Sequence, residues 1–429
     1  MTGTRSYTFF RSSWFIWGLA TITVLFQFLL QTSVSVMIPK LREAFNANVL
    51  GVSLISASFF YTYVFLQMPA GMLFDKFPAR NILAIGIICV GVACLLFALS
   101  PNVSVAIMSR LIMGCFCAVA FPGALYLAAN LFPPQRFAFI VGVTEMFGML
   151  GAALGEQFLA VCVEHHGWRQ SMLYCSITAF LLAILLYWVL DKNLTKPVLD
   201  RFPMSQRTSI LNKLLIVIKM PQAWLCGIYS GLMFVIISTF ASLWCITYIV
   251  KLYEVNLTQA ATASALIFFG AAIGNPLFGW ISDRIKRRKP ILFISAGLAA
   301  LLLMIIFYLP HLSLLSLNFL LFGLGFVCCG YALPFAIARE ITPVACQGAM
   351  LGFINMLSIS VGAPILQPII GWLLNQYYGM RPIGQSVALN PDLYRHVIGN
   401  SLIICILLAF AIAFIIKETH CRDTSLSQP

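Results

Sequence analysis

Apolar residues fill this chain in long runs that short polar segments separate. A run of roughly 18–25 apolar residues is long enough to cross a lipid bilayer as an α-helix. Twelve such runs lie near residues 14–38, 50–74, 82–100, 104–128, 137–162, 169–190, 222–248, 258–282, 290–309, 313–337, 346–374 and 394–416. The first begins like a signal peptide, but it continues to about Met37 without a small-residue cleavage site. We therefore expect an all-α integral membrane protein with twelve transmembrane helices.

The longest polar stretch divides these runs into two sets of six. It extends from Asp191 to Pro221 and contains six lysines and arginines. We therefore predict an N-terminal six-helix bundle over residues 1–190, a linker over 191–221 and a C-terminal six-helix bundle over 222–429.

One polar loop motif occurs in both halves. Gly71 is followed by Asp75 four residues later, and Gly279 is followed by Asp283 in a segment 208 residues further along. Basic residues, including Arg80 and Arg284, follow each aspartate. One helical turn places the glycine and the aspartate on the same helix face, so a partner helix can approach the glycine closely. The carboxylate can then pair with nearby cations or with the N-terminus of another helix.

The halves repeat each other elsewhere. The segment Arg110–Pro122 in the fourth run corresponds to Phe322–Pro334 in the tenth, at an offset of 212 residues. Such a duplication predicts two pseudo-symmetric bundles with a binding site between them near the membrane midplane. Within the fifth run, Gly148, Gly151 and Gly155 predict close helix packing.

Composition supports a membrane protein over a nucleic-acid-binding one. Hydrophobic residues make up 61% of the chain and charged residues 9%, and the mean hydropathy is +0.95. The net charge of +13 comes from basic residues in loops, which favours a lipid surface as the partner. One set of loops and tails holds 19 lysines and arginines and the opposite set holds 6, which places both termini in the cytoplasm.

The chain has no plausible catalytic motif. It contains no phosphate-binding glycine-rich loop that ends in Lys-Ser/Thr, no cluster of metal-ligand spacing and no plausible Ser/His/Asp set. We therefore expect no enzyme activity, no cofactor and no metal, and we expect transport driven by a gradient.

The repeated loop and the segment Arg110–Pro122 resemble the major facilitator superfamily over essentially the whole chain. The glycine that ends the family's loop motif is replaced by Pro78 in the first copy and by Lys286 in the second. The resemblance implies alternating access, with Asp75 facing the start of the eleventh helix and Asp283 the start of the fifth when the cytoplasmic side is closed. It also implies a functional monomer.

A narrower resemblance rests on six short segments. They are Gln31–Met37, Phe59–Gly71, Gly148–Ala152, Gly167–Arg169, Ala338–Glu340 and Gln367–Trp372. Together they resemble the phagosomal transporter (Pht) branch of intravacuolar bacteria. That resemblance implies a bacterial inner membrane and the uptake of amino acids or nucleosides.

Three ionisable side chains fall within the predicted membrane core. Arg110 and Glu156 each lie about six residues from the same end of their helices, or about 9 Å deep, and Glu145 lies nearer the middle. An unpaired carboxyl in such a place is easily neutralised, as a proton carrier must be, so Glu145 and Glu156 are proton-coupling candidates. Two other interpretations stay open: a static Arg110–Glu156 salt bridge, and a Glu145 that binds a substrate amine directly.

Neutral polar residues complete the candidate site. The resemblance implies that the first, fourth, seventh and tenth helices line the cavity, which selects Gln27, Gln31, Tyr126 and Tyr331 beside Arg110 as substrate-binding residues. Further polar candidates on other helices are Tyr63, Asn275, Asn355 and Gln367.

The sequence therefore predicts a secondary transporter that imports a small polar metabolite, an amino acid or a nucleoside, by proton symport. The alternatives are a siderophore or drug transporter of the same fold and a transport-inactive membrane receptor. The short tail from Glu418 to Pro429 argues against a receptor with an output domain.

Overall fold

The computed structural model describes residues 13–132, 134–190, 215–309, 312–342, 347–378 and 391–420. Within these ranges the ordered elements are helical. In the first half they are α2 (Ser13–Thr32), α3 (Ile38–Phe45), α4 (Val49–Lys76), α5 (Ala79–Ala98), α6 (Val103–Cys117), α7 (Ala120–Leu131) and α8 (Pro134–Val189). In the second half they are α10 (Pro221–Val235), η3 (Ile236–Trp244), α11 (Cys245–Tyr253), α12 (Leu257–Ile285), α13 (Lys289–Tyr308), α14 (Leu314–Val327), η4 (Cys328–Ala332), α15 (Leu333–Ile341), α16 (Gln347–Ser360), η6 (Val361–Leu366), α17 (Gln367–Tyr378) and α18 (Pro391–Ile415).

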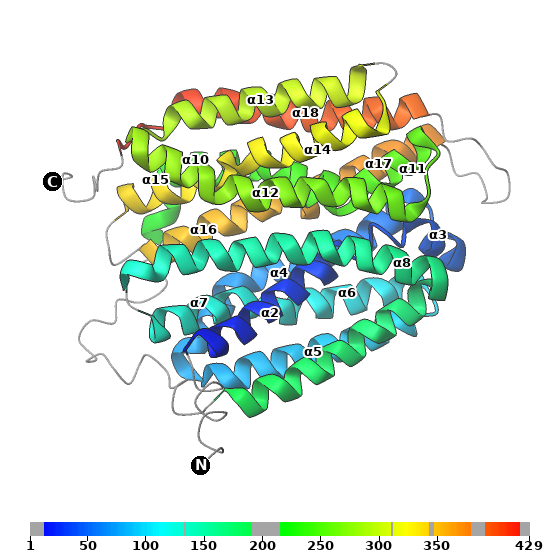
Figure 1. The fold of residues 1–429 in the computed structure, drawn as a ribbon, viewed down its shortest axis with the longest axis horizontal. Helices are drawn as coiled ribbons and strands as arrows, with labels where there is room; N and C mark the ends of the chain where they lie inside the picture. Colours follow the sequence, from blue (N-terminus) through cyan, green and yellow to red (C-terminus); the bar gives the residue numbers. More distant parts are fainter. Residues whose placement is uncertain are drawn as a thin grey trace, which may run out of the picture.

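The prediction of twelve membrane crossings is confirmed. Eleven described helical segments are long and apolar enough to cross a membrane, and one of them, Gly142–Val189, has 48 residues. That segment is a hairpin, because Gly167 adopts φ 80° and ψ 164° and reverses the chain within α8. Figure 1 shows α8 running the length of the molecule and then turning back.

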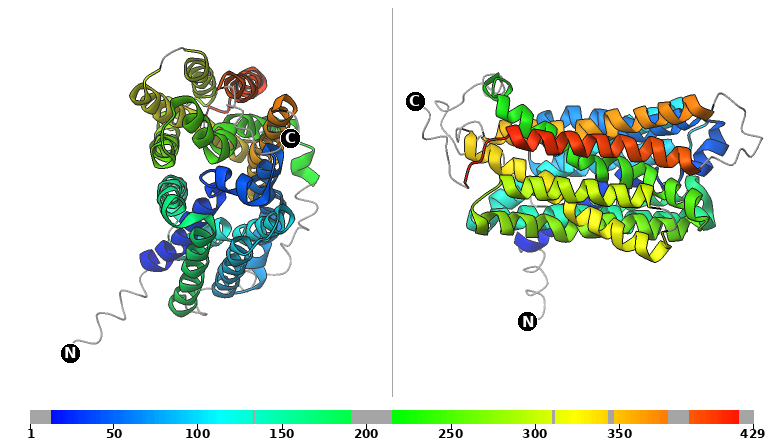
Figure 2. Two further views of the ribbon diagram at one scale, coloured as in Figure 1. Left: turned by 90° about the vertical axis from the view of Figure 1, so that its right-hand side faces the viewer. Right: turned by 90° about the horizontal axis from the view of Figure 1, so that it is seen from above.

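The two halves form two groups of helices that lie side by side (Figures 1 and 2). We call one end of the molecule the motif end, because it holds the segments Asp75–Arg80 and Asp283–Lys289. We call the opposite end, where α3 and α11 lie, the α3 end (Figure 1).

Several predicted helices are interrupted in mid-span. The first α-helix ends at Thr32 and gives way to a turn before α3, so the prediction of an unbroken helix over 14–38 was wrong. The seventh and eleventh crossings each contain a π-helical segment, η3 and η6, and Pro364 lies in η6. Gln367 stabilises η3, since its Nε2 donates to the carbonyl oxygen of Ser238 at 2.7 Å and to the hydroxyl of Ser242 at 3.1 Å. These breaks free backbone groups within the membrane-spanning region.

Glycines set the closest helix contacts. A methyl group added at Gly151 of α8 would lie 2.2 Å from the carbonyl oxygen of Leu25 in α2, which confirms the predicted close packing of the fifth crossing. Methyl groups at Gly148 and Gly155 would also be crowded by α2 side chains. The fifth crossing therefore packs backbone to backbone against the first.

The same close helix contact occurs within each half of the structure. A methyl group at Gly114 of α6 would lie 1.9 Å from the carbonyl oxygen of Phe59 in α4, and one at Gly325 of α14 would lie 1.9 Å from that of Ile267 in α12. Gly325 follows Gly114 by 211 residues, and Ile267 follows Phe59 by 208. The same pair of helices thus meets in the same way in both bundles.

Candidate functional site

Polar side chains from three crossings meet between the two halves. Gln27 of α2 donates to the hydroxyl of Tyr63 in α4 at 2.8 Å. Tyr63 also interacts with Gln67, one turn further along α4. Gln67 accepts a hydrogen bond from Asn355 of α16, and this bond joins the halves. These four residues begin what we call the central cluster.

Tyr331 and Glu145 extend the central cluster. Asn275 of α12 donates to the hydroxyl of Tyr331 at 3.1 Å. Glu145 of α8 is half-buried and is close enough to Tyr63 and Tyr331 to interact electrostatically with both phenols. The central cluster therefore combines amides, phenols and one carboxyl from both halves, which can hydrogen-bond a polar solute and attract an ammonium group.

Two of the predicted binding residues make their described contacts with residues outside this cluster. Tyr126 of α7 stacks on Phe74 with ring centroids 5.5 Å apart. Gln31 is buried at the end of α2, and its backbone carbonyl accepts a hydrogen bond from Arg110. Tyr63, Asn275 and Asn355 were further polar candidates in the sequence, whereas Gln67 was missed. Tyr63 and Gln67 are spaced four residues apart on one helix face, and this spacing was the signal available.

Arg110 hydrogen-bonds to the C-terminal end of α2, where the first crossing is interrupted. The residue is 0% exposed, and one Nη donates to the carbonyl oxygen of Leu30 at 2.8 Å while the other donates to that of Gln31 at 3.4 Å. Its guanidinium also lies 4.8 Å from the ring centroid of Phe59. Since the last carbonyls of a helix carry partial negative charge, Arg110 caps the C-terminus of α2 inside the protein.

Glu156 lies on α8 at the boundary between the halves. It is 0% exposed, and its Oε1 accepts from the hydroxyl of Ser35 at 3.1 Å. The hydroxyl of Ser264 on α12, in the other half, also interacts with this carboxyl. The Oε2 atom has no hydrogen-bond partner in the described part of the chain. Arg110 and Glu156 do not bond to each other, so the interpretation of a static salt bridge is wrong for this conformation.

Replacing Arg110 by glutamine is expected to lower the stability of the protein strongly. Each lost hydrogen bond from a charged donor costs about 1.5–3 kcal/mol, and the carbonyls of Leu30 and Gln31 would be left buried without this donor. The measurement is the thermal transition of the purified protein in detergent. Arg287→Gln is the matched control, because Arg287 is an exposed arginine. Equal thermal transition temperatures for the two variants would show that Arg110 does not stabilise the interrupted end of α2.

Comparison with known proteins identifies the family. The profile of the Major Facilitator Superfamily matches residues 20–257 and 223–426, which together cover most of the chain. The chain belongs to the Major Facilitator Superfamily. The chain shares its fold with a bacterial homolog of the human lysosomal transporter Spinster, solved in an inward-facing and occupied conformation. The TM-score is 0.75 at 13% sequence identity, over 94% of this chain and 96% of the other.

Relatives of the chain are described as transporters or as a sensor. A probable sulfoacetate transporter of Cupriavidus necator is 24% identical over 66% of this chain and 67% of its own length. A membrane sensor protein of Escherichia coli is 24% identical over 78% of this chain and 81% of its own length. A probable hexose phosphate transport protein of Chlamydia trachomatis is 21% identical over 56% of this chain and 57% of its own length.

In its second copy, the superfamily loop motif forms contacts with residues of its own half. Asp283 is 69% exposed by its side chain and accepts from Arg288 at 2.7 Å, within its own half. Gly279 has open space beside it, so the prediction that a partner helix approaches this glycine closely was wrong for the described conformation. Arg284 lies over the ring of Trp280, 5.3 Å from its centroid.

In the first copy of the motif, Arg80 lies 3.8 Å from the ring centroid of Tyr187. The surroundings of Gly71 and the side chain of Asp75 lie outside the described part of the structure. Their gating role, like that of Asp283, stays a prediction.

The segment after α18 docks onto the second loop, which the sequence did not indicate. Glu418 accepts from the backbone N–H groups of Arg288 and Lys289 at 2.9 Å each, at the N-terminus of α13. Arg288 also donates to Glu340 at 2.7 Å, and Glu340 bonds to the hydroxyl of Thr419. The chain end, the loop and α15 are thus joined at the motif end.

Replacing Glu418 by glutamine is expected to remove about 1 kcal/mol of stability at neutral pH, as the loss of a helix cap does. Burial acts to raise the pKa of the Glu418 carboxyl, but four backbone N–H donors lower it, so that the pKa lies below its ordinary value of 4.5. A lowered pKa stabilises the folded state above pH 4.5, and this contribution is lost as the pH falls further. The thermal transition temperatures of wild type and variant should therefore become equal as the pH is lowered from neutral to acidic values. Glu43→Gln, at an exposed carboxylate of α3, is the control and should match wild type throughout.

The α3 end of the molecule is closed. Glu164 of α8 accepts from the backbone N–H of Thr258 at 3.0 Å and from its hydroxyl at 2.6 Å, so a carboxylate of one half sits at the N-terminus of α12 in the other. A methyl group at Gly371 of α17 would lie 2.2 Å from the hydroxyl of Ser53 in α4. Residues 30–38 and 236–249 are buried throughout. The halves therefore meet closely at this end.

Proposed function

We propose that this protein imports an amino acid or a nucleoside across a bacterial inner membrane by proton symport. The observation that carries this proposal is the central cluster. Its one carboxyl, its amides and its phenols suit a solute with an amine and several hydrogen-bonding groups. Within the described residues, no lysine or arginine hydrogen-bonds or ion-pairs with the cluster. The resemblance of short segments to the phagosomal transporter branch supports the same substrate class.

The proposed mechanism is alternating access by rocking of the two bundles, in a monomer with both termini in the cytoplasm. The motif end would then face the cytoplasm. Asp75 and Asp283 would stabilise the state that is closed at the motif end, and this agrees with the bond of Asp283 to its own half while the α3 end is closed. Arg110 would reach an anionic substrate group only by giving up its α2 acceptors.

Glu145 and Glu156 are the proposed proton carriers. They are 11 residues apart on α8, so they lie near one helix face with a rise of about 16 Å between them. Glu156 is sealed beneath the closed α3 end, whereas Glu145 is half-buried in the central cluster. Such a pair would let a proton enter near one end of the transporter and leave near the other.

A second candidate function is the transport of a small organic anion. Two relatives described as probable sulfoacetate and hexose phosphate transporters favour it. In either case transport would need no cofactor. The relative described as a membrane sensor keeps a transport-inactive receptor as a third outcome of the test.

Counterflow in proteoliposomes separates these functions. Labelled amino acids and nucleosides are compared with sulfoacetate and glucose 6-phosphate, each with the same unlabelled compound inside the vesicles. Saturable exchange of an amino acid or a nucleoside is the expected result. Exchange of the anions alone would establish the second candidate, and a ligand-dependent thermal shift without any exchange would establish a sensor.

A further inference from the structure

A cavity of about 360 Å³ lies at the α3 end, apart from the central cluster. A cavity of about 150 Å³ is enough to hold benzene, so this one has room for an aromatic ring with a short chain. Its lining residues are Ser35, Val36, Ile38, Pro39, Lys40, Arg42, Val49, Val52, Ser53, Val163, Glu164, Leu243, Trp244, Ile246, Thr247, Val250, Lys251, Leu257 and Tyr394. They come from both halves, and most are apolar.

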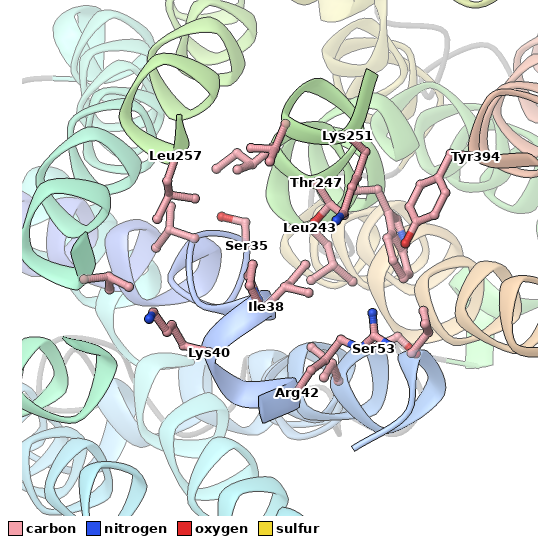
Figure 3. Close-up of a pocket in the computed structure, with 18 of the residues that line it drawn as sticks. Ser35, Ile38, Lys40, Arg42, Ser53, Leu243, Thr247, Lys251, Leu257 and Tyr394 are labelled. Atoms are coloured by element: carbon pink, nitrogen blue, oxygen red, sulfur yellow. The ribbon is translucent and has the colours of Figure 1, made fainter. Parts of the chain in front are cut away.

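Positive charge dominates the polar part of the lining. Lys40, Arg42 and Lys251 contribute three cations. The one carboxylate in the lining, Glu164, is already bonded to Thr258. Within the described part of the chain, Arg42 and Lys251 have no ion pair. Figure 3 shows Arg42 on one side of the cavity and Lys251 on the other.

Three buried polar atoms of residues that line this cavity have no hydrogen-bond partner among the described residues. They are Nε of Arg42, Nε1 of Trp244 and the hydroxyl oxygen of Thr247. Trp244 is 2% exposed and Thr247 is 9% exposed, so bulk water reaches neither side chain freely. Buried polar groups are normally hydrogen-bonded, and a group of unpartnered atoms around one cavity indicates an occupant. All three can donate a hydrogen bond, which suits an acceptor.

We propose that this cavity binds a small organic anion with an apolar body, such as an aryl carboxylate. Its charged group lies between Arg42 and Lys251, with Thr247 and Trp244 as further donors, and its apolar part packs on the valines and leucines of the lining. Because both halves line the cavity, the bound anion stabilises the conformation that is closed at the α3 end. This site is distinct from the proposed transport site and does not depend on which solute is carried.

The test is isothermal titration of the full-length protein in lipid nanodiscs with 3-phenylpropionate, with empty nanodiscs subtracted. We expect saturable binding, and we expect the neutral 3-phenylpropionamide to bind at least about tenfold more weakly, since the amide cannot form charge-assisted bonds. Lys251→Gln and Arg42→Gln should each weaken binding about tenfold. Thr247→Val, which keeps the side-chain shape, should weaken it about threefold. Arg287→Gln, at the other end of the molecule, should leave binding unchanged.

The ligand-free thermal transition of each variant reports folding independently of binding. Thr247→Val removes a hydroxyl for which the described residues supply no partner, so it should not lower that transition. This variant keeps the proposal testable if Arg42→Gln fails to fold. Equal binding of the acid and the amide, binding unchanged in Lys251→Gln and Thr247→Val, or no heat beyond that of empty nanodiscs would each overturn the proposal.

Discussion

Replacing Glu156 by glutamine is expected to abolish proton-driven accumulation of substrate while exchange of substrate across the membrane continues. Glutamine keeps an acceptor for Ser35 and has nearly the same shape, but it cannot carry a proton. Glu156 is fully buried at the boundary between the halves, where a charge without a counter-ion is costly. The conformational change is therefore expected to need the neutral form, which glutamine imitates permanently.

The measurement is uptake into proteoliposomes with an imposed pH gradient, beside counterflow without one. Glu156→Gln should lose gradient-driven uptake by about a hundredfold and keep exchange within about threefold of wild type. Glu145→Gln, in the central cluster, is expected to impair both activities, since it also removes a substrate contact. Glu254→Gln, at an exposed carboxylate, should change neither. Normal gradient-driven uptake by Glu156→Gln would rule this residue out as a proton carrier.

Alanine at Gly114 or Gly325 is expected to prevent normal folding of the corresponding bundle. The added methyl group would lie 1.9 Å from a backbone carbonyl oxygen in both positions, and a backbone cannot move aside as a flexible side chain can. Overpacking of this kind costs about 3 kcal/mol or more, whereas alanine at an open helical position gains up to about 1 kcal/mol over glycine.

The measurements are the yield of monodisperse protein after detergent extraction and its thermal transition. Gly279→Ala and Gly352→Ala are matched controls, since neither glycine has an atom within 4 Å of the added methyl group. Both controls should be as stable as wild type. If Gly114→Ala and Gly325→Ala behaved like these controls, the helix contacts that repeat between the bundles would not limit stability.

The number of crossings could be predicted because lipid imposes a minimum length on each apolar run. The interruptions could not be predicted, because they depend on partners far along the chain. The π-helical segment η3 relies on Gln367, 129 residues from the Ser238 carbonyl that it binds. The end of α2 relies on Arg110, 80 residues beyond Leu30. Hydropathy describes each run by itself and contains no information on such pairs.

Sequence position gave the depth of a side chain in the membrane but not its direction around the helix axis. Arg110 and Glu156 were placed at similar depths, yet Arg110 points to α2 while Glu156 bonds to Ser35 and faces α12. Gln27 and Tyr331 were selected from the helices expected to line the cavity, and each hydrogen-bonds to a residue on a neighbouring helix. The partners of a buried polar group therefore had to come from the packing of the whole bundle.

The docking of Glu418 and Thr419 also affects how this protein can be shortened or tagged. Glu418 and Thr419 hold residues of a loop and of α15 together, and α18 itself ends at Ile415. A truncation placed at the end of the last transmembrane helix would remove both anchors. Shortened versions made for crystallisation should therefore retain the chain through His420, and an affinity tag or reporter fusion should be attached beyond that residue.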